Sequence, residues 1–188
     1  MTYPAYHCRP VAAFGDPEAR LLVVGLAPGM HGANATGRPF TGDHAGILLY
    51  ETLHKHGFAS AATSVAPDDG LQLLNCRITN AVKCLPPANK PTAAEIRTCN
   101  DYLSVELAQL EAGGVIVALG RIAHDAVVRA LGLKRAAVSF GHGAEHQLVS
   151  QGLTLIDSYH CSRYNTQTKR LTPAMFDDVF ARARSALA

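Results

Sequence analysis

The sequence predicts a three-layer α/β/α sandwich with a mostly parallel central sheet of about four strands. Short apolar runs, which favour buried strands, alternate along the chain with segments that carry apolar residues at helical spacing. Such alternation places helices on both faces of a parallel sheet. The chain has 188 residues and no internal repeat or linker, so we expect one domain over residues 1–188.

Four segments are expected to form the sheet. Each is a short apolar run bounded by turn residues, and they cover residues 21–24, 78–82, 115–119 and 153–158. Residues 3–20 show no clear periodicity and are expected to form an irregular arm. Because parallel strands end at a common edge of a sheet, the loops that follow these strands are expected to gather there.

Four helices are expected, over residues 46–56, from 92 to about 111, from 120 to 132, and from 172 onward. Thr92 and Glu95 have the spacing of a capping box, and Pro173 suits the first turn of the last helix. The apolar residues at helical spacing, which we expect to face the core, are Ile47, Leu48, Tyr50 and Leu53, then Ile122, Ala123, Ala126, Val127 and Ala130, then Phe176, Val179, Phe180, Ala183 and Leu187.

Composition excludes several classes of protein. Hydrophobic residues make up 48% of the chain and charged residues 17%, which argues against disorder. No apolar run approaches the ~20 residues of a membrane helix, and the N-terminus lacks the features of a signal peptide, so a cytoplasmic protein is expected. A net charge of +2 is too small to indicate nucleic-acid binding by itself.

The loop after the first strand has features of a ligand-binding loop. Residues 25–43 contain five glycines and two prolines, and glycine lets the backbone approach a ligand closely. Phe40 and Asp43 add a flat apolar face and a carboxylate. Loops of this length in compact domains are usually functional or disordered. An ordinary surface loop explains this stretch equally well when it is taken alone.

Two further loops follow strands. Residues 84–91 contain three prolines, which lack a backbone N–H, so a stiff loop without regular hydrogen bonding is expected. Residues 160–170 are rich in cations and in hydrogen-bonding groups of the kinds that bind phosphates. A plain proline-rich connector and a structural histidine at position 160 are the alternatives for these two loops.

The three loops resemble the signature motifs of the uracil-DNA glycosylase superfamily, and most closely those of its family 5, the UdgB-like branch. The first motif is similar to residues 25–28 with 36–43, the second to 84–91, and the third to 160–166, where Cys161 stands in place of the usual proline. The similarity extends from about Arg9 to the C-terminus. It implies an enzyme of base-excision repair that hydrolyses the N-glycosidic bond of uracil in DNA, reached by flipping the nucleotide out of the duplex.

The resemblance also implies catalytic residues. The inert side chains of Ala27 and Pro28 are typical of family 5 and move the catalytic carboxylate to Asp43, with Asn89 as a second polar group. His160 would stabilise the leaving base, as neutral imidazole or as imidazolium. The same departure implies a base tolerance that extends to hypoxanthine.

Binding residues follow from the same resemblance. Phe40 would stack on the flipped base, and the residues implied to line the base site are Gly25, Leu26, Ala27, Pro28, Gly29, Phe40 and Asn165. Those implied to contact the DNA strand are Lys90, Ser162, Arg163 and Tyr164; Tyr164 would either wedge into the duplex or pack locally. DNA with deaminated bases is the expected partner, and nothing indicates a membrane or an obligate protein partner.

Members of this family carry a four-iron, four-sulfur (4Fe-4S) cluster on four cysteines. Cys84 and Cys99 match the second pair of these cysteine ligands. The family's first pair lies near the N-terminus, where this sequence has Cys8 alone, and we expect the sequence to begin after that pair. Cys76 would lie on the order of 25 Å from Cys84 across a strand, at ~3.3 Å per residue. The set is therefore incomplete, and Cys161 is expected to be a buried or pocket-lining thiol.

Two other functions compete with this one. The spacing of Gly25 and Gly29 after a strand fits a phosphate-binding turn of an unrelated nucleotide hydrolase, although the lysine of a P-loop is missing. A non-catalytic protein of the same fold that binds uracil or single-stranded DNA is the second alternative.

Overall fold

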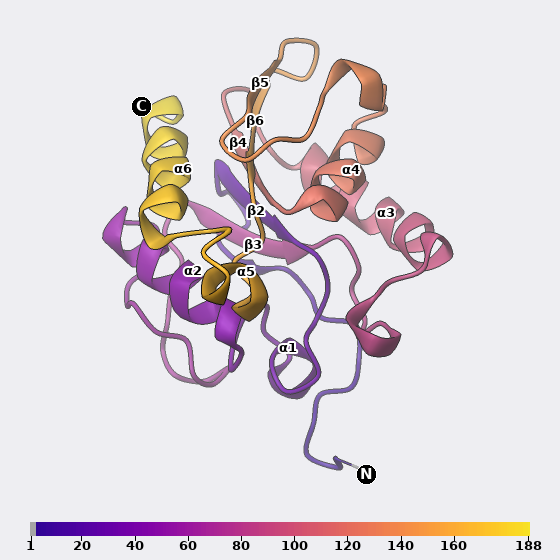
Figure 1. Ribbon diagram of the computed structural model, residues 1–188, viewed down its shortest axis with the longest axis vertical. Coiled ribbons are helices and arrows are strands. Elements are labelled where there is room, and N and C mark those ends of the chain that lie inside the picture. The colour runs from indigo at the N-terminus through magenta and orange to yellow at the C-terminus, as the bar shows by residue number, and fades with distance from the viewer. Residues whose placement is uncertain (1–2) are drawn as a thin grey trace.

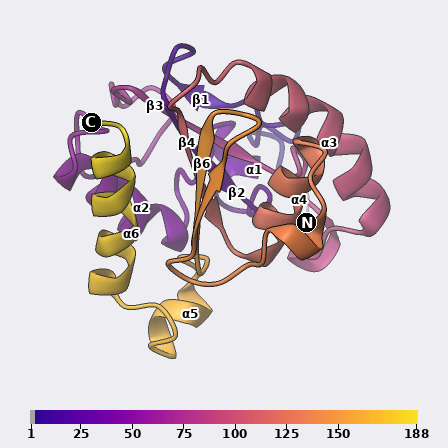
Figure 2. The same ribbon diagram turned by 90° about the horizontal axis from the view of Figure 1, so that it is seen from above.

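The computed structural model describes residues 3–188. A six-stranded sheet lies between two layers of helices. Helices α2 (His44–Lys55) and α6 (Pro173–Ala186) cover one face, and α3 (Ala93–Ala108) and α4 (Arg121–Ala130) cover the other (Figure 1, Figure 2). The expected three-layer α/β/α sandwich is confirmed.

The strand order is β1-β3-β2-β4-β6-β5. The central strands β2 (Leu21–Gly25), β3 (Cys76–Asn80), β4 (Val115–Leu119) and β6 (Leu153–Ser158) pair in parallel. They are the four strands expected from the sequence. Strand β3 begins and ends two residues earlier than predicted, because its register with β2 places Cys76 opposite Leu21 and Asn80 opposite Gly25.

Two short strands at the sheet edges were not expected. Strand β1 (Phe14–Gly15) pairs antiparallel with β3, and β5 (Glu145–Leu148) pairs antiparallel with β6. The expectation of an irregular arm over residues 3–20 was therefore wrong at β1. Edge strands face solvent on one side, so β5 carries mainly polar residues and lacks the apolar pattern that marks a central strand.

The core is divided by the sheet into two clusters. Leu21 and Val23 of β2 pack on the side of α2 and α6, whereas Leu22 and Val24 pack on the side of α3 and α4. Both faces of the central strands are therefore buried, which explains why each strand is a continuous apolar run. Burial of one such side chain contributes roughly 1.5–3 kcal/mol.

The helices follow the sequence prediction with local differences. The expected core face of α6 is buried as predicted. Helix α2 begins at His44 rather than Gly46 because Asp43 caps it. Ile47 faces outward and is 63% exposed, so its expected place in the core was wrong. Ile122 of α4 is exposed as well. Helix α3 ends at Ala108, before the expected end near residue 111.

Single helical turns occur inside the loops: α1 (Ala33–Thr36), α5 (Arg163–Gln167) and the 3₁₀ turns η1 (Pro87–Asn89) and η2 (Arg135–Ala137). The expectation that residues 84–91 lack regular hydrogen bonds was wrong. Prolines keep their carbonyl oxygens, and the N–H groups of Asn89 and Lys90 donate to Pro86 and Pro87.

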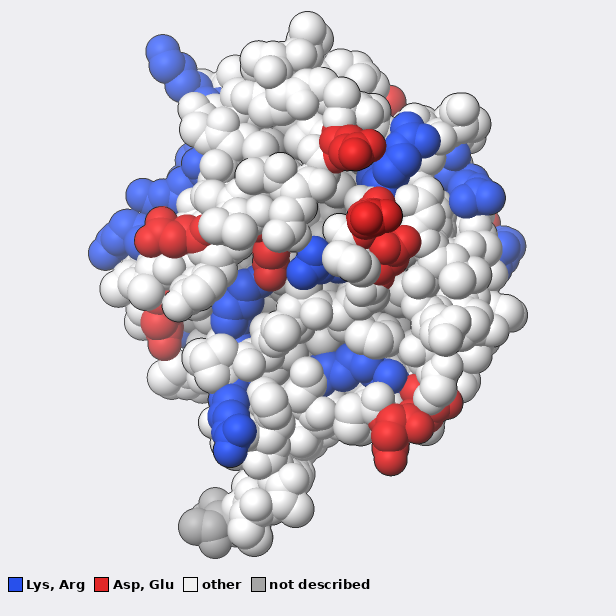
Figure 3. All heavy atoms as spheres, turned by 180° about the vertical axis from the view of Figure 1, so that it is seen from behind, with Lys and Arg blue, Asp and Glu red and all other residues white. Residues whose placement is uncertain are grey.

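On the face opposite to that of Figure 1, acidic and basic side chains are interspersed (Figure 3). Over residues 3–188, the helices are all too short or too polar to span a bilayer.

Candidate active site

A cavity of about 900 Å³ opens at the carboxyl ends of the four parallel strands. Residues from each strand end line it: Leu26 follows β2, Asn80 ends β3, Gly120 follows β4 and His160 follows β6. Strand β2 lies between β3 and β4, so the strand order changes direction at this point. Open parallel sheets bind their ligands at such a switch point. The three loops selected from the sequence therefore meet at one site.

Most of the site residues expected from the sequence line this cavity: Leu26, Ala27, Gly29, Phe40, Asp43, Asn89, His160, Ser162, Arg163 and Asn165. Gly25 lies behind the ring of Phe40, where a Cβ would come within 2.5 Å of Phe40 Cζ. Pro28 is buried and does not line the cavity. Lys90 and Tyr164 are exposed and lie outside its lining.

Phe40 is fixed by the start of α2. Its φ of 55° is a left-handed conformation that non-glycine residues rarely adopt. A side chain at Gly46 would collide with the carbonyl oxygen of Phe40, and the Tyr50 hydroxyl donates to the Pro39 carbonyl at 2.7 Å. Such strained residues persist only where their surroundings enforce them, and they cluster at functional sites.

A buried arginine secures the same turn from the other side. The guanidinium of Arg38 donates to Thr41 Oγ1, to Ser64 Oγ and to Asp69 Oδ2, at 2.9, 2.7 and 2.7 Å. Arg38 is only 4% exposed. Its charge holds the pKa of the Asp69 carboxyl well below its usual range. Residues 64–69 are thereby bound to the turn that carries Phe40.

Asp43 combines two roles at the start of α2. Its Oδ1 accepts the N–H of Gly46 at 2.9 Å and caps the helix. Its Oδ2 faces the glycine loop: a Cβ would lie 3.7 Å from Oδ2 if it were added at Gly29, and 2.7 Å from it if added at Gly32. Burial raises the pKa of Asp43, and the N–H bonds from Gly46 and Ala45 partly oppose this. Asp43 thus caps the helix through one oxygen and lines the cavity beside the glycine loop.

His160 is half-buried and lines the cavity beside Phe40. The two rings are stacked, with centroids 6.0 Å apart and planes inclined by 27°. The surrounding protein desolvates the imidazole and lowers its pKa to about 4, so His160 is neutral at neutral pH. Asn165 donates its amide to the His160 carbonyl at 2.8 Å, and therefore supports this loop as well as lining the cavity.

Asn89 lies at the rim rather than deep in the cavity. It ends the 3₁₀ turn η1 with a φ of 55°, and its side chain is exposed while lining the opening. The structure thus brings Phe40, Asp43 and His160 together inside the cavity and places Asn89 at its entrance.

Asn80 is a cavity residue that the sequence reasoning missed. It is 3% exposed, lines the cavity, and its Oδ1 has no hydrogen-bond partner among residues 3–188. Buried polar atoms are nearly always paired, so an unpaired amide oxygen in a cavity indicates a ligand. The signal in the sequence was an amide at the end of an apolar run; the predicted strand, extending to residue 82, placed Asn80 in mid-strand.

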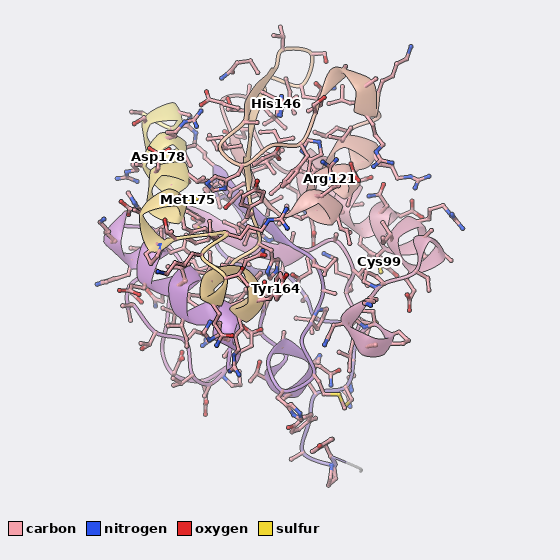
Figure 4. All side chains as sticks on the ribbon, viewed as in Figure 1. Cys99, Arg121, His146, Tyr164, Met175 and Asp178 are labelled. Atoms are coloured by element: carbon pink, nitrogen blue, oxygen red, sulfur yellow. The ribbon has the colours of Figure 1, made fainter. Side chains whose placement is uncertain are left out.

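Two arginines at the cavity were also missed. Arg121 lies over the ring of Phe140 at 5.1 Å, and Arg170 lies over Tyr159 at 4.7 Å. Both line the cavity together with Arg163. Figure 4 shows Arg121 at the start of α4 and Tyr164 on α5. The arrangement gives the opening three cations held by aromatic or helical supports.

The cysteines do not fit a four-iron cluster. Cys84 has Cys99 as a neighbour, and Cys99 Sγ accepts the N–H of Lys83 at 3.5 Å. Cys8 Sγ accepts from Asn34 at 3.7 Å. Cys76 and Cys161 are fully buried in the core on the side of α2 and α6. Across residues 3–188 no three thiols lie close enough to share one ion. At most three cysteines remain for a cluster that needs four.

Comparisons with known proteins extend these observations. Residues 12–184 match the family model described as the uracil DNA glycosylase superfamily. A type-5 uracil-DNA glycosylase of Thermus thermophilus is 51% identical over 179 residues, which is 95% of this chain and 81% of that protein. One of Mycobacterium leprae is 46% identical over 181 residues, 95% and 79% of the two chains. A type-4 uracil-DNA glycosylase of Archaeoglobus fulgidus is 35% identical over 155 residues, 80% and 69% of the two chains.

Proposed function

The chain belongs to the uracil-DNA glycosylase superfamily, and on this premise we propose that it hydrolyses the N-glycosidic bond of uracil in DNA and so begins base-excision repair. The observation that carries the proposal is one cavity in which an aromatic ring, a carboxylate, an unpaired amide and a neutral imidazole converge. We further propose that residues 1–188 act as a single glycosylase domain.

Phe40 and Asn80 recognise the base. A nucleotide flipped out of the duplex enters the cavity, and its ring stacks on Phe40, a contact worth about 1–3 kcal/mol. The amide of Asn80 pairs with the N3–H and O4 of uracil, which satisfies its unpaired oxygen. Hypoxanthine presents an N1–H beside O6 in the same arrangement, so the same amide accepts it. The proposal therefore includes hypoxanthine as a second substrate.

Asp43 and His160 carry the chemistry. As the bond from C1′ to the base breaks, its electron pair leaves with the base and positive charge develops on the sugar. Asp43 Oδ2 stabilises this charge, orients a water for attack on C1′ and takes its proton. Neutral His160 donates a hydrogen bond to the oxygen of the leaving uracil anion and keeps its own proton. Asn89 at the rim orients the sugar or the water beside Asp43.

The cations around the opening bind the DNA strand. Arg121 and Arg170, with Arg163 and Ser162, contact phosphates on either side of the flipped nucleotide, and Lys90 and Tyr164 contact the strand farther out. Their aromatic supports hold the guanidinium groups of Arg121 and Arg170 in place before DNA binds. No step of this mechanism uses an iron–sulfur cluster.

The test is release of uracil from a labelled oligonucleotide, single- or double-stranded, followed by hot alkali to cleave the abasic site. Cleavage that requires both uracil and the enzyme supports the proposal. Binding of uracil-containing DNA without cleavage indicates the non-catalytic alternative. Neither binding nor cleavage, with folded protein, contradicts the proposed activity on uracil. A hypoxanthine oligonucleotide run in parallel tests the second substrate.

A further inference from the structure

Three side chains with metal-ligating groups meet outside the active-site lining. They are His124 of α4, His146 of β5 and Asp157 of β6, and their ligand atoms lie within 4.8 Å of one another. Asp157 Oδ1 is 2.7 Å from His124 Nδ1, and Asp157 Oδ2 is 3.4 Å from His146 Nε2. Figure 4 shows His146 near the top of the view, above Tyr164. None of these three residues was expected from the sequence to have a role.

The cluster is buried and its geometry is fixed. His124 and Asp157 are 1% and 0% exposed, and the His146 side chain is 20% exposed. His124 Nε2 bonds the carbonyl of Val138 at 3.0 Å, which directs Nδ1 toward the carboxylate. A second hydrogen bond of this kind on the far ring nitrogen is the usual support of a metal-bound histidine. Asp157 Oδ2 in turn accepts the N–H of Gly141 at 3.3 Å.

One ligand atom of the cluster is unsatisfied. His146 Nε2 is buried and has no hydrogen-bond partner among the described residues, although it faces the carboxylate of Asp157. A buried ring nitrogen without a partner is uncommon, and each instance needs an explanation such as an ion or a water. A cation between the two rings and the carboxylate would satisfy Nε2 and neutralise the buried negative charge.

We propose that His124 Nδ1, His146 Nε2 and a carboxylate oxygen of Asp157 bind one divalent transition-metal ion, best suited to Zn²⁺. Zn²⁺ binds sets of two imidazoles and one carboxylate in proteins, whereas Mg²⁺ and Ca²⁺ prefer oxygen ligands alone. A fourth position is left for water in a tetrahedral arrangement. Binding requires neutral imidazoles, so any proton shared by His124 and Asp157 passes to solvent as the metal enters.

The site would brace one wall of the active-site cavity. It joins α4, the edge strand β5 and the central strand β6. The ring of Phe140 packs against His124 with centroids 5.6 Å apart, and Phe140 and Gly141 both line the cavity. A metal bound here would fix the segment before β5. Its effect on stability is therefore measurable apart from catalysis.

The experiment uses the full chain treated with a chelator and then titrated at neutral pH with Zn²⁺ and, separately, with Co²⁺. The expected result is one equivalent bound, a higher melting temperature, and Co²⁺ absorption of a tetrahedral site without the charge-transfer band of thiolate ligands. His146→Gln removes a direct ligand, and we expect it to lower the affinity for Zn²⁺ by about 100-fold. This is the upper end of the losses seen when a residue that hydrogen-bonds a metal ligand is replaced.

Two controls separate this site from others. His56→Gln changes a histidine that is also paired with a carboxylate, Asp177 at 2.8 Å, but belongs to no three-ligand cluster among residues 3–188, and it should bind as the unchanged chain does. The double variant Cys84→Ser/Cys99→Ser should also keep the site. The proposal is overturned by stoichiometric binding that survives in His146→Gln, by binding that is lost with the cysteines, or by no binding in a chelator-treated protein that remains folded.

Discussion

Replacement of Asp43 by asparagine separates the two roles of this residue. The asparagine Oδ1 still accepts the Gly46 N–H, since asparagine and aspartate are comparable helix caps. The side chain that faces the cavity loses its charge and its ability to accept a proton. We expect the rate of uracil release to fall by about 10²–10⁴-fold, the usual contribution of a general base.

Stability should respond in the opposite direction to activity. Burial raises the pKa of Asp43, so at neutral pH the ionised carboxylate is disfavoured in the folded state relative to the unfolded chain. The contribution of Asp43 to folding stability is complete below the pKa that it has in the unfolded chain. It is lost as the pH rises through the pKa that it has in the folded protein. Asp43→Asn should therefore melt at the same temperature as the unchanged chain, or slightly higher.

Asp43→Ala supplies the comparison. It loses both the base and the cap, and loss of a cap costs about 1 kcal/mol. For a chain of this size that corresponds to a melting temperature lower by about 2–4 °C. The assay is single-turnover release of uracil, with thermal melting of the same samples. An asparagine variant with most of its activity, or one destabilised as much as the alanine variant, would refute the reasoning.

Three further predictions follow from the cavity. His160→Ala should lower the rate of uracil release by about 10²–10³-fold. Because the pKa of His160 is about 4, the activity of the unchanged chain should not fall between pH 6 and 8 through loss of an imidazolium proton. A fall in that range that disappears in His160→Gln would contradict a neutral imidazole. Gly25→Ala should lower the rate of uracil release by about 10²-fold, because its Cβ displaces the Phe40 ring and the Asn80 amide and a misplacement of ~1 Å can cost that much. Gly29→Ala, whose Cβ has one contact at 3.7 Å, should lose less activity. Equal losses in the two variants would argue against the base site. Arg121→Ala and Arg170→Ala should each weaken DNA binding and lower the slope of log K against log[salt] by about 0.7–0.9, and an unchanged slope in titrations at several salt concentrations would exclude a phosphate contact.

Much of the fold was predictable because the central strands are buried on both faces. Continuous apolar runs predicted the residue ranges of β2, β4 and β6 closely. The alternation of these runs with helical segments predicted the three-layer arrangement. The edge strands were not predictable, because β5 is mainly polar and β1 has only two residues. The single turns α1 and α5 are too short to show a helical period.

The site was predictable in part because loops after parallel strands converge. That rule, with the resemblance of the motifs, selected Phe40, Asp43 and His160, which line one cavity. Asn80 was missed because its importance depends on where β3 ends, and strand ends are set by register with a neighbour. Arg121 and Arg170 were missed because their aromatic supports are distant in sequence. The roles assigned to these residues stay predictions.

The buried guanidinium of Arg38 has a consequence for how this protein can change. Residues 64–69 do not border the cavity, yet they share a polar anchor with the turn that aims the aromatic ring. Insertions or deletions in that outer segment, which surface loops ordinarily tolerate, would here reach the reaction centre through Arg38. Engineers who graft or shorten the segment should therefore preserve Ser64 and Asp69 as though they belonged to the catalytic apparatus.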